Sequence, residues 1–210
     1  MAYKRLTEMM KNLFVLILAM LPFLNVVAQQ DSEGYTDVTH NLRSGYVLRE
    51  IKTPSVNINN KLVVNDGDNS NVILSYYNEL TSTVLKNGNK VDTYKICFSI
   101  EDSSSFHIAE NGRLLIKLGN DKIVTLSAWR DSDADSIKNG KYHANVEYKI
   151  TAKQLDTIIK KNVKKFRIEK IMGEYIDIEP DFNVSETTKE FKTGLYDRLK
   201  TKKDSFTSGF

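Results

Sequence analysis

The residues that most constrain the fold are 106–128, whose sequence FHIAENGRLLIKLGNDKIVTLSA places short apolar runs between turn residues. This pattern predicts three short β-strands joined by tight turns at 110–112 and 119–121. In the first turn, Gly112 would take the left-handed conformation that costs other residues energy. We therefore expect an antiparallel meander around which the rest of the chain is organised, with the register of its second turn left open.

The first turn determines which side chains face each other. A three-residue loop places Ile108 opposite Leu114 and Phe106 opposite Ile116, so that apolar side chains meet. A two-residue loop would place His107 opposite Ile116 instead. Because a shift of one residue exchanges the two faces of a strand, we favour the first register.

The N-terminal residues have the pattern of a secretory signal peptide. Basic residues precede an apolar run at 13–24, and small or apolar residues stand at 26–28. These features predict a signal peptide at 1–28, with cleavage after Ala28. The alternative is a membrane anchor, but the apolar run is short for a bilayer span. We expect an exported protein of the periplasm or cell surface, with no transmembrane segment after cleavage.

Charge and cysteine content narrow the class of the mature chain. Residues 1–28 carry +2 of the chain's net charge of +3, so the remaining 182 residues carry +1. This balance argues against a dedicated nucleic-acid binder. Cys97 is the only cysteine, which excludes an internal disulfide. A chain of this length can bury a core without such cross-links.

The mature chain is predicted to be one domain with polar ends. Residues 29–44 lack hydrophobic periodicity and predict a flexible lead-in, while 202–210 predict a loose tail. The residues between them, 45–201, predict a single α+β domain. We expect an antiparallel-rich β-sheet with one strand–helix–strand unit and a C-terminal helix.

Periodicity locates several of these elements. Alternating apolar residues predict strands at 90–100 and 142–150, and in the first of these the face that carries Lys95 is expected to lie in solvent. Capping-box sequences at 151–154 and 187–190 predict the starts of two helices.

The last predicted hairpin, 164–170 with 174–179, has a register that two kinds of pair support. One alignment gives two apolar pairs and two pairs of opposite charge: Phe166 with Ile178, Ile168 with Ile176, Lys165 with Glu179, and Arg167 with Asp177. Cross-strand pairs of these kinds each contribute roughly 0.2–1 kcal/mol. We therefore predict this register.

Two blocks of the sequence resemble a group of small exported Bacteroidetes-type proteins of unknown function. The blocks are FHIAENGRLLIKLGNDKIVTL at 106–126 and YKITAKQLDTIIKKNVKKFRIE at 148–169, and the likeness extends over 94–170. In that group an LLIKL-like strand, a turn, a second strand and a helix precede an RIE-like strand. The resemblance implies a shared fold, and it carries over no functional residue.

Asp131, Asp133 and Asp135 are spaced like the first ligands of a calcium-binding loop. An EF-hand is excluded, because Ser136 stands at the sixth position, which needs glycine, and Tyr142 at the twelfth, which needs glutamate. A looser calcium site is a hypothesis to set beside a solvated loop. No cofactor is expected otherwise.

The histidines and the cysteine do not form a recognisable catalytic or metal motif. His40, His107 and His143 are isolated, without a second ligand at the spacing of a preformed zinc site. His107 is expected to be a hydrogen-bonded structural residue, and His143 is expected to face solvent. Cys97 lacks the sequence context of a nucleophile.

A run of basic residues at 160–167 has a structural explanation. It comprises Lys160, Lys161, Lys164, Lys165 and Arg167. The first two would end a helix, whose dipole favours cations, and the last two have predicted acidic partners.

Three functional hypotheses follow. The first and favoured one is a non-catalytic binding or accessory module that contacts a protein, a glycan or another envelope component. The second is a hydrolase whose site is assembled from residues far apart in the sequence. The third is a calcium-stabilised surface domain.

Overall fold

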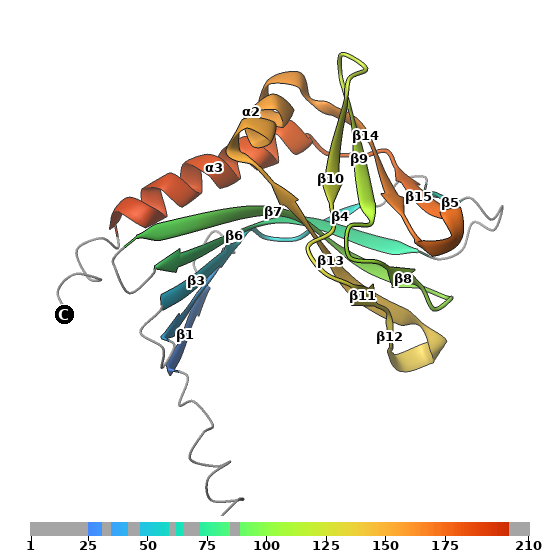
Figure 1. Cartoon of the computed structure of the whole chain (residues 1–210), viewed down its shortest axis with the longest axis horizontal. Helices are drawn as coiled ribbons and strands as arrows, with labels where there is room; N and C mark the ends of the chain where they lie inside the picture. The colour runs from blue at the N-terminus through green and yellow to red at the C-terminus, as the bar shows by residue number, and fades with distance from the viewer. Residues whose placement is uncertain are drawn as a thin grey trace, which may run out of the picture.

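The strands of the first β-sheet come from residues 25–150. The computed structural model describes residues 25–30, 35–41, 47–58, 62–64, 72–84 and 89–201. The strand order of this sheet is β1-β2-β3-β6-β7-β13-β12, and β4 also pairs with β6 (Figure 1). The strands are β1 (Asn25–Gln30), β2 (Thr36–Asn41), β3 (Val47–Lys52), β4 (Val56–Ile58), β6 (Ile73–Val84), β7 (Lys90–Asp102), β12 (Asp135–Ser136) and β13 (Tyr142–Ile150).

A second sheet and two helices lie on one face of the first sheet (Figure 1). The strand order of the second sheet is β10-β9-β14-β15-β5, and β11 and β8 form a separate pair. The remaining elements are β5 (Leu62–Val64), β8 (His107–Ile108), β9 (Arg113–Leu118), β10 (Ile123–Ser127), β11 (Ser132–Asp133), α2 (Ala152–Lys161), β14 (Val163–Glu169), β15 (Tyr175–Ile178) and α3 (Val184–Thr201). The paired strands are antiparallel.

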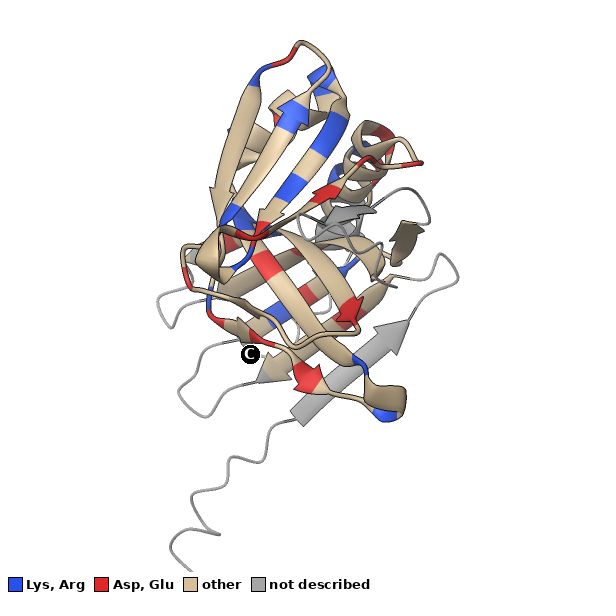
Figure 2. Ribbon diagram, turned by 90° about the vertical axis from the view of Figure 1, so that its right-hand side faces the viewer, with Lys and Arg blue, Asp and Glu red and all other residues tan. Residues whose placement is uncertain are grey.

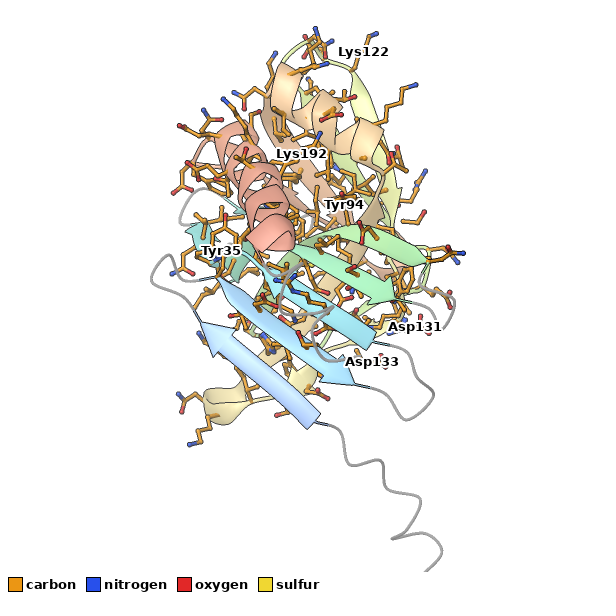
Figure 3. The ribbon with its side chains drawn as sticks, turned by 90° about the vertical axis from the view of Figure 1, so that its left-hand side faces the viewer. Tyr35, Tyr94, Lys122, Asp131, Asp133 and Lys192 are labelled. Atoms are coloured by element: carbon orange, nitrogen blue, oxygen red, sulfur yellow. The ribbon has the colours of Figure 1, made fainter. Side chains whose placement is uncertain are left out.

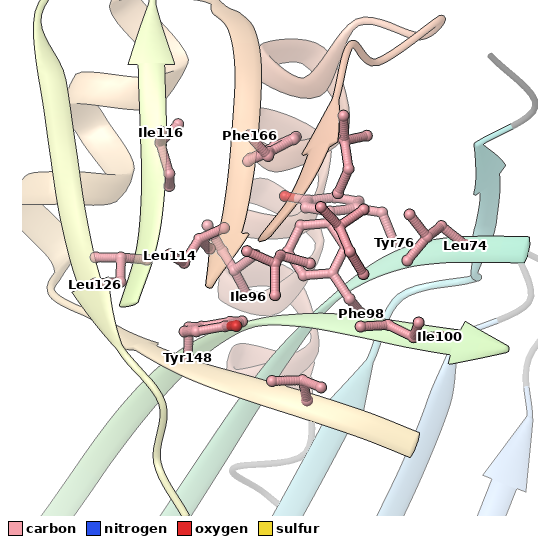
Figure 4. Packing of buried hydrophobic residues seen from close by; sticks show 14 of the residues in the cluster. Leu74, Tyr76, Ile96, Phe98, Ile100, Leu114, Ile116, Leu126, Tyr148 and Phe166 are labelled. Carbon is pink, nitrogen blue, oxygen red and sulfur yellow. The ribbon is translucent and has the colours of Figure 1, made fainter. Parts of the chain in front are cut away.

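The hydrophobic core joins the two sheets. The ring of Phe166 in β14 lies 5.3 Å from that of Phe98 in β7 and 5.9 Å from that of Tyr76 in β6, measured between centroids (Figure 4). Leu155 and Ile158 of α2 are buried in the same cluster. One shared core therefore supports both sheets, and the broad α+β class is as predicted.

The arrangement of the strands differs from the single sheet expected. Two main sheets are present, and α2 connects β13 of the first sheet to β14 of the second. The face of β7 that carries Lys95 was expected in solvent, yet Lys95 and Cys97 are both buried. Charged side chains of the neighbouring strands account for the burial of Lys95, as described below.

The predicted meander is wrong in its first part. Ile108 does not pair with Leu114, because β8 pairs with β11, where Ile108 lies opposite Ser132. Asn111, with φ of 69°, takes the left-handed position expected for Gly112. A Cβ on Gly112 would lie 2.8 Å from the carbonyl oxygen of Ala109, so glycine is needed there for close approach.

The second part of the meander, β9 with β10, is present with a defined register. Ile116 lies opposite Val124, and Leu114 lies opposite Leu126. Asp121, with φ of 61°, takes the left-handed position of the connecting turn.

The predicted lead-in at 29–44 contains regular structure. It includes the end of β1 and all of β2, which pairs with β1 on one side and β3 on the other. Buried Asp37 binds Arg49 of β3 through two hydrogen bonds, of 2.9 and 2.5 Å, which ties this polar segment to the sheet. The predicted cleavage site after Ala28 falls inside β1. Residues 1–24 and the predicted tail at 202–210 lie outside the described residues.

The two helices begin with different caps. For α2 the predicted capping box is present, since Gln154 N donates to Thr151 Oγ1 and Thr151 N donates to Gln154 Oε1. For α3 the expected start near Thr187 is wrong, because the helix begins at Val184 and Glu186 N donates to Asn183 Oδ1. Within the described ranges, no helix is long and apolar enough to span a bilayer.

The last hairpin has the predicted register. Phe166 lies opposite Ile178, Arg167 opposite Asp177 and Ile168 opposite Ile176. Arg167 binds Asp177 with two hydrogen bonds, of 2.6 and 2.7 Å. Lys165 differs from expectation, because its Nζ lies 2.8 Å from the same Asp177 and not beside Glu179.

This geometry predicts measurable coupling between positions 167 and 177. We expect Arg167→Glu to destabilise the fold because it sets two carboxylates side by side, and we expect the added Asp177→Arg change to restore part of the loss. Partly exposed pairs contribute about 1 kcal/mol or less, so the coupling should be of that size. Urea unfolding of both single variants and the double variant measures it, and additive effects would contradict the pairing.

Candidate functional site

A buried charge cluster lies on the face of the first sheet that points away from the core. Lys95 Nζ donates to Glu79 Oε1 and to Glu147 Oε2, both at 2.8 Å. Lys52 Nζ lies 3.2 Å from Glu79, and Arg130 donates to Glu147 at 2.8 Å. The three central side chains come from the adjacent strands β6, β7 and β13. The cluster is internally paired, which marks it as structural.

Cys97 lies beside this cluster and is not set up as a nucleophile. Burial, together with the charges of Glu79 and Glu147, raises the pKa of the thiol well above its usual value. A neutral buried thiol is a poor nucleophile.

Glu79 and Asp177 each bind two cations, and these ion pairs predict how the stability of the fold depends on pH. Burial alone would raise the pKa of each carboxyl, but Lys95 and Lys52 outweigh burial at Glu79, and Arg167 and Lys165 outweigh it at Asp177. Both pKa values therefore lie below those of ordinary carboxyls. The stabilisation is complete above the unfolded pKa values, near 4, and is lost as pH falls through the folded values.

We expect the free energy of unfolding to decline progressively below about pH 4. Urea unfolding at a series of pH values measures this decline. The Glu79→Gln/Asp177→Asn variant should be less stable at neutral pH and should show a shallower decline. An equally steep decline in that variant would contradict the assignment.

His107 lies in an open cleft beside two carboxylates. Its Nδ1 is 2.5 Å from Asp133 Oδ1 and its Nε2 is 3.7 Å from Asp131 Oδ1. The cleft has a volume of about 330 Å³ and is also lined by Lys170 and Met172. The hydrogen bond agrees with the structural role expected for His107. A histidine held by a carboxylate in a cleft is also the arrangement that most favours a hydrolase.

The three aspartates of the calcium hypothesis do not converge on one point. Asp131 accepts the amide of Glu110 at 2.6 Å, while Asp133 binds His107. Asp135 lies in β12 opposite His143. Across the described residues, no group of three or more histidine, cysteine or acidic side chains is placed to hold a metal ion.

The other two histidines also contact neighbours. His143, which was expected to face solvent, is partly buried, and its Nε2 lies 2.8 Å from Ser99 Oγ. His40 lies 4.0 Å from Glu50.

The end of the second sheet carries a dense group of exposed lysines, which we call the basic tip. It comprises Lys117, Lys122, Lys160, Lys161 and Lys164. Figure 2 shows Lys and Arg concentrated on this sheet, and Figure 3 places Lys122 at one end of the molecule, away from the loop with Asp131 and Asp133.

Backbone contacts bring the two halves of the basic tip together. The amide of Gly119, in the β9–β10 turn, donates to the carbonyl oxygens of Lys161 at 3.1 Å and Asn162 at 3.0 Å. A Cβ on Gly119 would lie 2.5 Å from the carbonyl oxygen of Lys161, so glycine is required for this approach. Asp121 lies 3.3 Å from both Lys117 Nζ and Lys164 Nζ. Asp156, one helical turn before Lys160 in α2, is a second nearby carboxylate, so the tip combines five lysines with two aspartates.

The basic run seen in the sequence contains three of the five lysines of the basic tip. The run at 160–167 was assigned to a helix end and to strand pairs, and the predicted pair is present for Arg167, whereas Lys165 binds Asp177 in place of Glu179. Lys117 and Lys122 are about forty residues away and join the run through the pairing of β9 with β14, where Lys117 lies opposite Lys165, and through the Gly119 contact. The glycine in the predicted turn was the available sign of a close approach.

Comparisons with known proteins found no matching protein-family model, no matching curated protein and no matching solved structure. The resemblance to small exported Bacteroidetes-type proteins stays a prediction.

Proposed function

We propose that this protein is an exported, non-catalytic binding module that holds an anionic polysaccharide of the cell envelope. The basic tip carries the proposal. Five exposed lysines near two aspartates, Asp121 and Asp156, leave a local positive charge on a chain whose net charge after the predicted cleavage is only +1. Such a concentration of charge attracts and orients an anionic ligand.

The shape of the basic surface favours an extended polymer over a small ion. From the tip, cations continue along the outer face of the second sheet through Lys165 and Arg167 of β14 and Arg113 of β9. Lys117 and Arg113 are four residues apart on β9, which is about 13 Å along a strand. Lys165 and Arg167 share Asp177, and Arg113 binds Glu169 at 2.7 Å. The row thus retains excess positive charge, mostly at the tip.

Binding is a better account of the side chains than catalysis. The Cys97 thiol is held neutral, and both ring nitrogens of His107 face carboxylates. In the part of the chain that the structure describes, His107 hydrogen-bonds Asp133 and does not hydrogen-bond a serine, threonine or cysteine. The signal-peptide pattern at 1–28 supports export, and N-terminal sequencing of the envelope protein, with Gln29 expected first, tests it.

Fluorescence anisotropy with labelled polygalacturonate, a carboxylated polysaccharide, tests the proposal. We expect binding that weakens with added salt, and neutral dextran should not compete. Lys117→Glu/Lys164→Glu should weaken binding roughly tenfold or more, since several exposed charge pairs are lost. Vesicles of phosphatidylglycerol serve as a second probe, because lipid headgroups are another source of anionic groups.

The matched control is Lys138→Glu/Lys189→Glu, which changes the net charge equally at exposed lysines of other elements. It should bind as the natural chain does. Equal weakening by both double variants would contradict a site at the tip. Binding to the vesicles with no binding to polygalacturonate would show that the ligand is a membrane surface and not a polysaccharide.

The His107–Asp133 contact favours a hydrolase as the second candidate. A panel of ester, peptide and glycoside substrates tests it. Turnover that is abolished by His107→Ala but kept by Lys117→Glu/Lys164→Glu would establish the hydrolase.

A further inference from the structure

Most of the outer edge of β10 presents backbone groups that no described strand pairs, and the exception is a bridge between Ala128 and Tyr148 of β13 at its end. Ala128 N donates to Gly112 O at 2.8 Å, which directs the backbone groups of Ala128 toward the β9 side. Because this direction alternates along a strand, the N–H and C=O groups of Ile123, Thr125 and Ser127 point away from β9. β10 is the last strand of its sheet. The row of donors and acceptors therefore faces outward.

The sequence of this edge lacks the charges and the proline that commonly protect an edge strand. Its sequence at 123–127, IVTLS, contains no charge and no proline. The large side chain of Ile123 is 61% exposed. Edges of this kind readily accept another strand.

A groove runs beside the edge where β13 separates from it. Trp129 N, just after β10, donates to Glu147 O of β13 at 2.8 Å, so β13 begins to pair with this edge. β13 then leads into α2 and leaves a groove of about 260 Å³. Thr125 lines one side of the groove, and Lys149 and Gln154 line it from β13 and α2. Figure 1 shows β10 and β13 diverging.

We propose that the edge of β10 binds an extended segment of a partner polypeptide, which adds to the second sheet as a sixth strand. The groove is smaller than typical small-molecule sites, which suits a chain segment anchored by one or two side chains. Because β13 and α2 bound its far side, the groove fits a single segment and not the edge of another folded domain. This surface is independent of the basic tip.

The surrounding residues define the chemistry of that segment. The inward row of β10, Val124 and Leu126, packs against the core, so apolar residues at alternate positions of the segment would continue this row. Lys149, exposed above the groove, favours a carboxylate at the end of the segment near Trp129. We therefore assign the edge to a segment with alternating apolar residues and an acidic end.

Selection from a phage-displayed library of twelve-residue peptides tests the assignment. We expect enrichment of peptides with the alternating apolar pattern. Thr125→Pro should weaken their binding roughly tenfold, because it removes an N–H that points away from β9. The hydrogen bonds between β10 and β9 stay intact in this variant. Thr125→Val keeps the backbone donor and should bind within about twofold of the natural chain.

Two further measurements test whether the peptide binds through backbone hydrogen bonds to β10. N-methylation at successive positions of a selected peptide should abolish binding at every second position. In the free protein the amides of Thr125 and Ser127 should exchange faster than that of Leu126, and peptide binding should slow their exchange. The assignment would be overturned if no peptide were enriched, or if Thr125→Pro left peptide binding unchanged. It would also be overturned if the N-methylated positions that abolish binding did not alternate along the peptide. So would a dimer in sedimentation that Thr125→Pro dissociates, since the edge would then pair with a second copy.

Discussion

Replacing Lys95 with methionine is expected to destabilise the protein by about 3–5 kcal/mol. Lys95 is the cation that both Glu79 and Glu147 bind at 2.8 Å, and all three side chains are buried. Without Lys95, two carboxylates stay buried in a site with little access to water. Lys52 and Arg130, at the edge of the cluster, are then their remaining cations. Urea unfolding followed by circular dichroism measures the loss.

Two variants separate this effect from the loss of a surface lysine. Lys149→Met, on the same face of the sheet but exposed, should cost under about 1 kcal/mol. Adding Glu79→Gln and Glu147→Gln to Lys95→Met should recover part of the stability, because no buried charge is then left unpaired. Equal costs for Lys95→Met and Lys149→Met would show that the cluster does not stabilise the fold.

Replacing Phe166 with alanine is expected to cost about 3–5 kcal/mol, the range for removing a fully buried aromatic ring. The ring packs between Phe98 and Tyr76 and so joins the second sheet to the first. Because both sheets share this core, we expect a single unfolding transition with a lower midpoint in denaturant.

Phe182→Ala is the matched control for this prediction. Its ring also lies against Tyr76, at 5.5 Å, but is only partly buried, so its removal should cost less. If tryptophan fluorescence, which reports on Trp129, and circular dichroism gave separate transitions for Phe166→Ala, the shared core would be contradicted.

The sequence predicts structure well where independent patterns agree within one hairpin. The register of β14 with β15 follows from apolar and charged pairs that select the same alignment. The start of α2 follows from a capping box that uses only local atoms. In these places the contacts that decide the structure lie within about fifteen residues of chain.

The predictions fail where a residue serves a partner distant in the sequence. Ile108 was expected to pair with Leu114 across the first turn, whereas it lies in β8 opposite Ser132 of β11. Lys95 was expected to lie in solvent, but it is buried because Glu79 and Glu147, from the strands on either side of β7, bind it. The basic tip depends on the pairing of β9 with β14 and on a backbone contact between the β9–β10 turn and the end of α2. Periodicity within one strand contains no information on such contacts.

The most direct test of the proposed function is a titration of the isotope-labelled protein with polygalacturonate, followed by backbone amide NMR. The proposal predicts that the largest saturable shifts fall at 117–122 and 160–165, the two segments of the basic tip. Shifts centred on His107 and on 131–135, or an absence of saturable shifts, would contradict it.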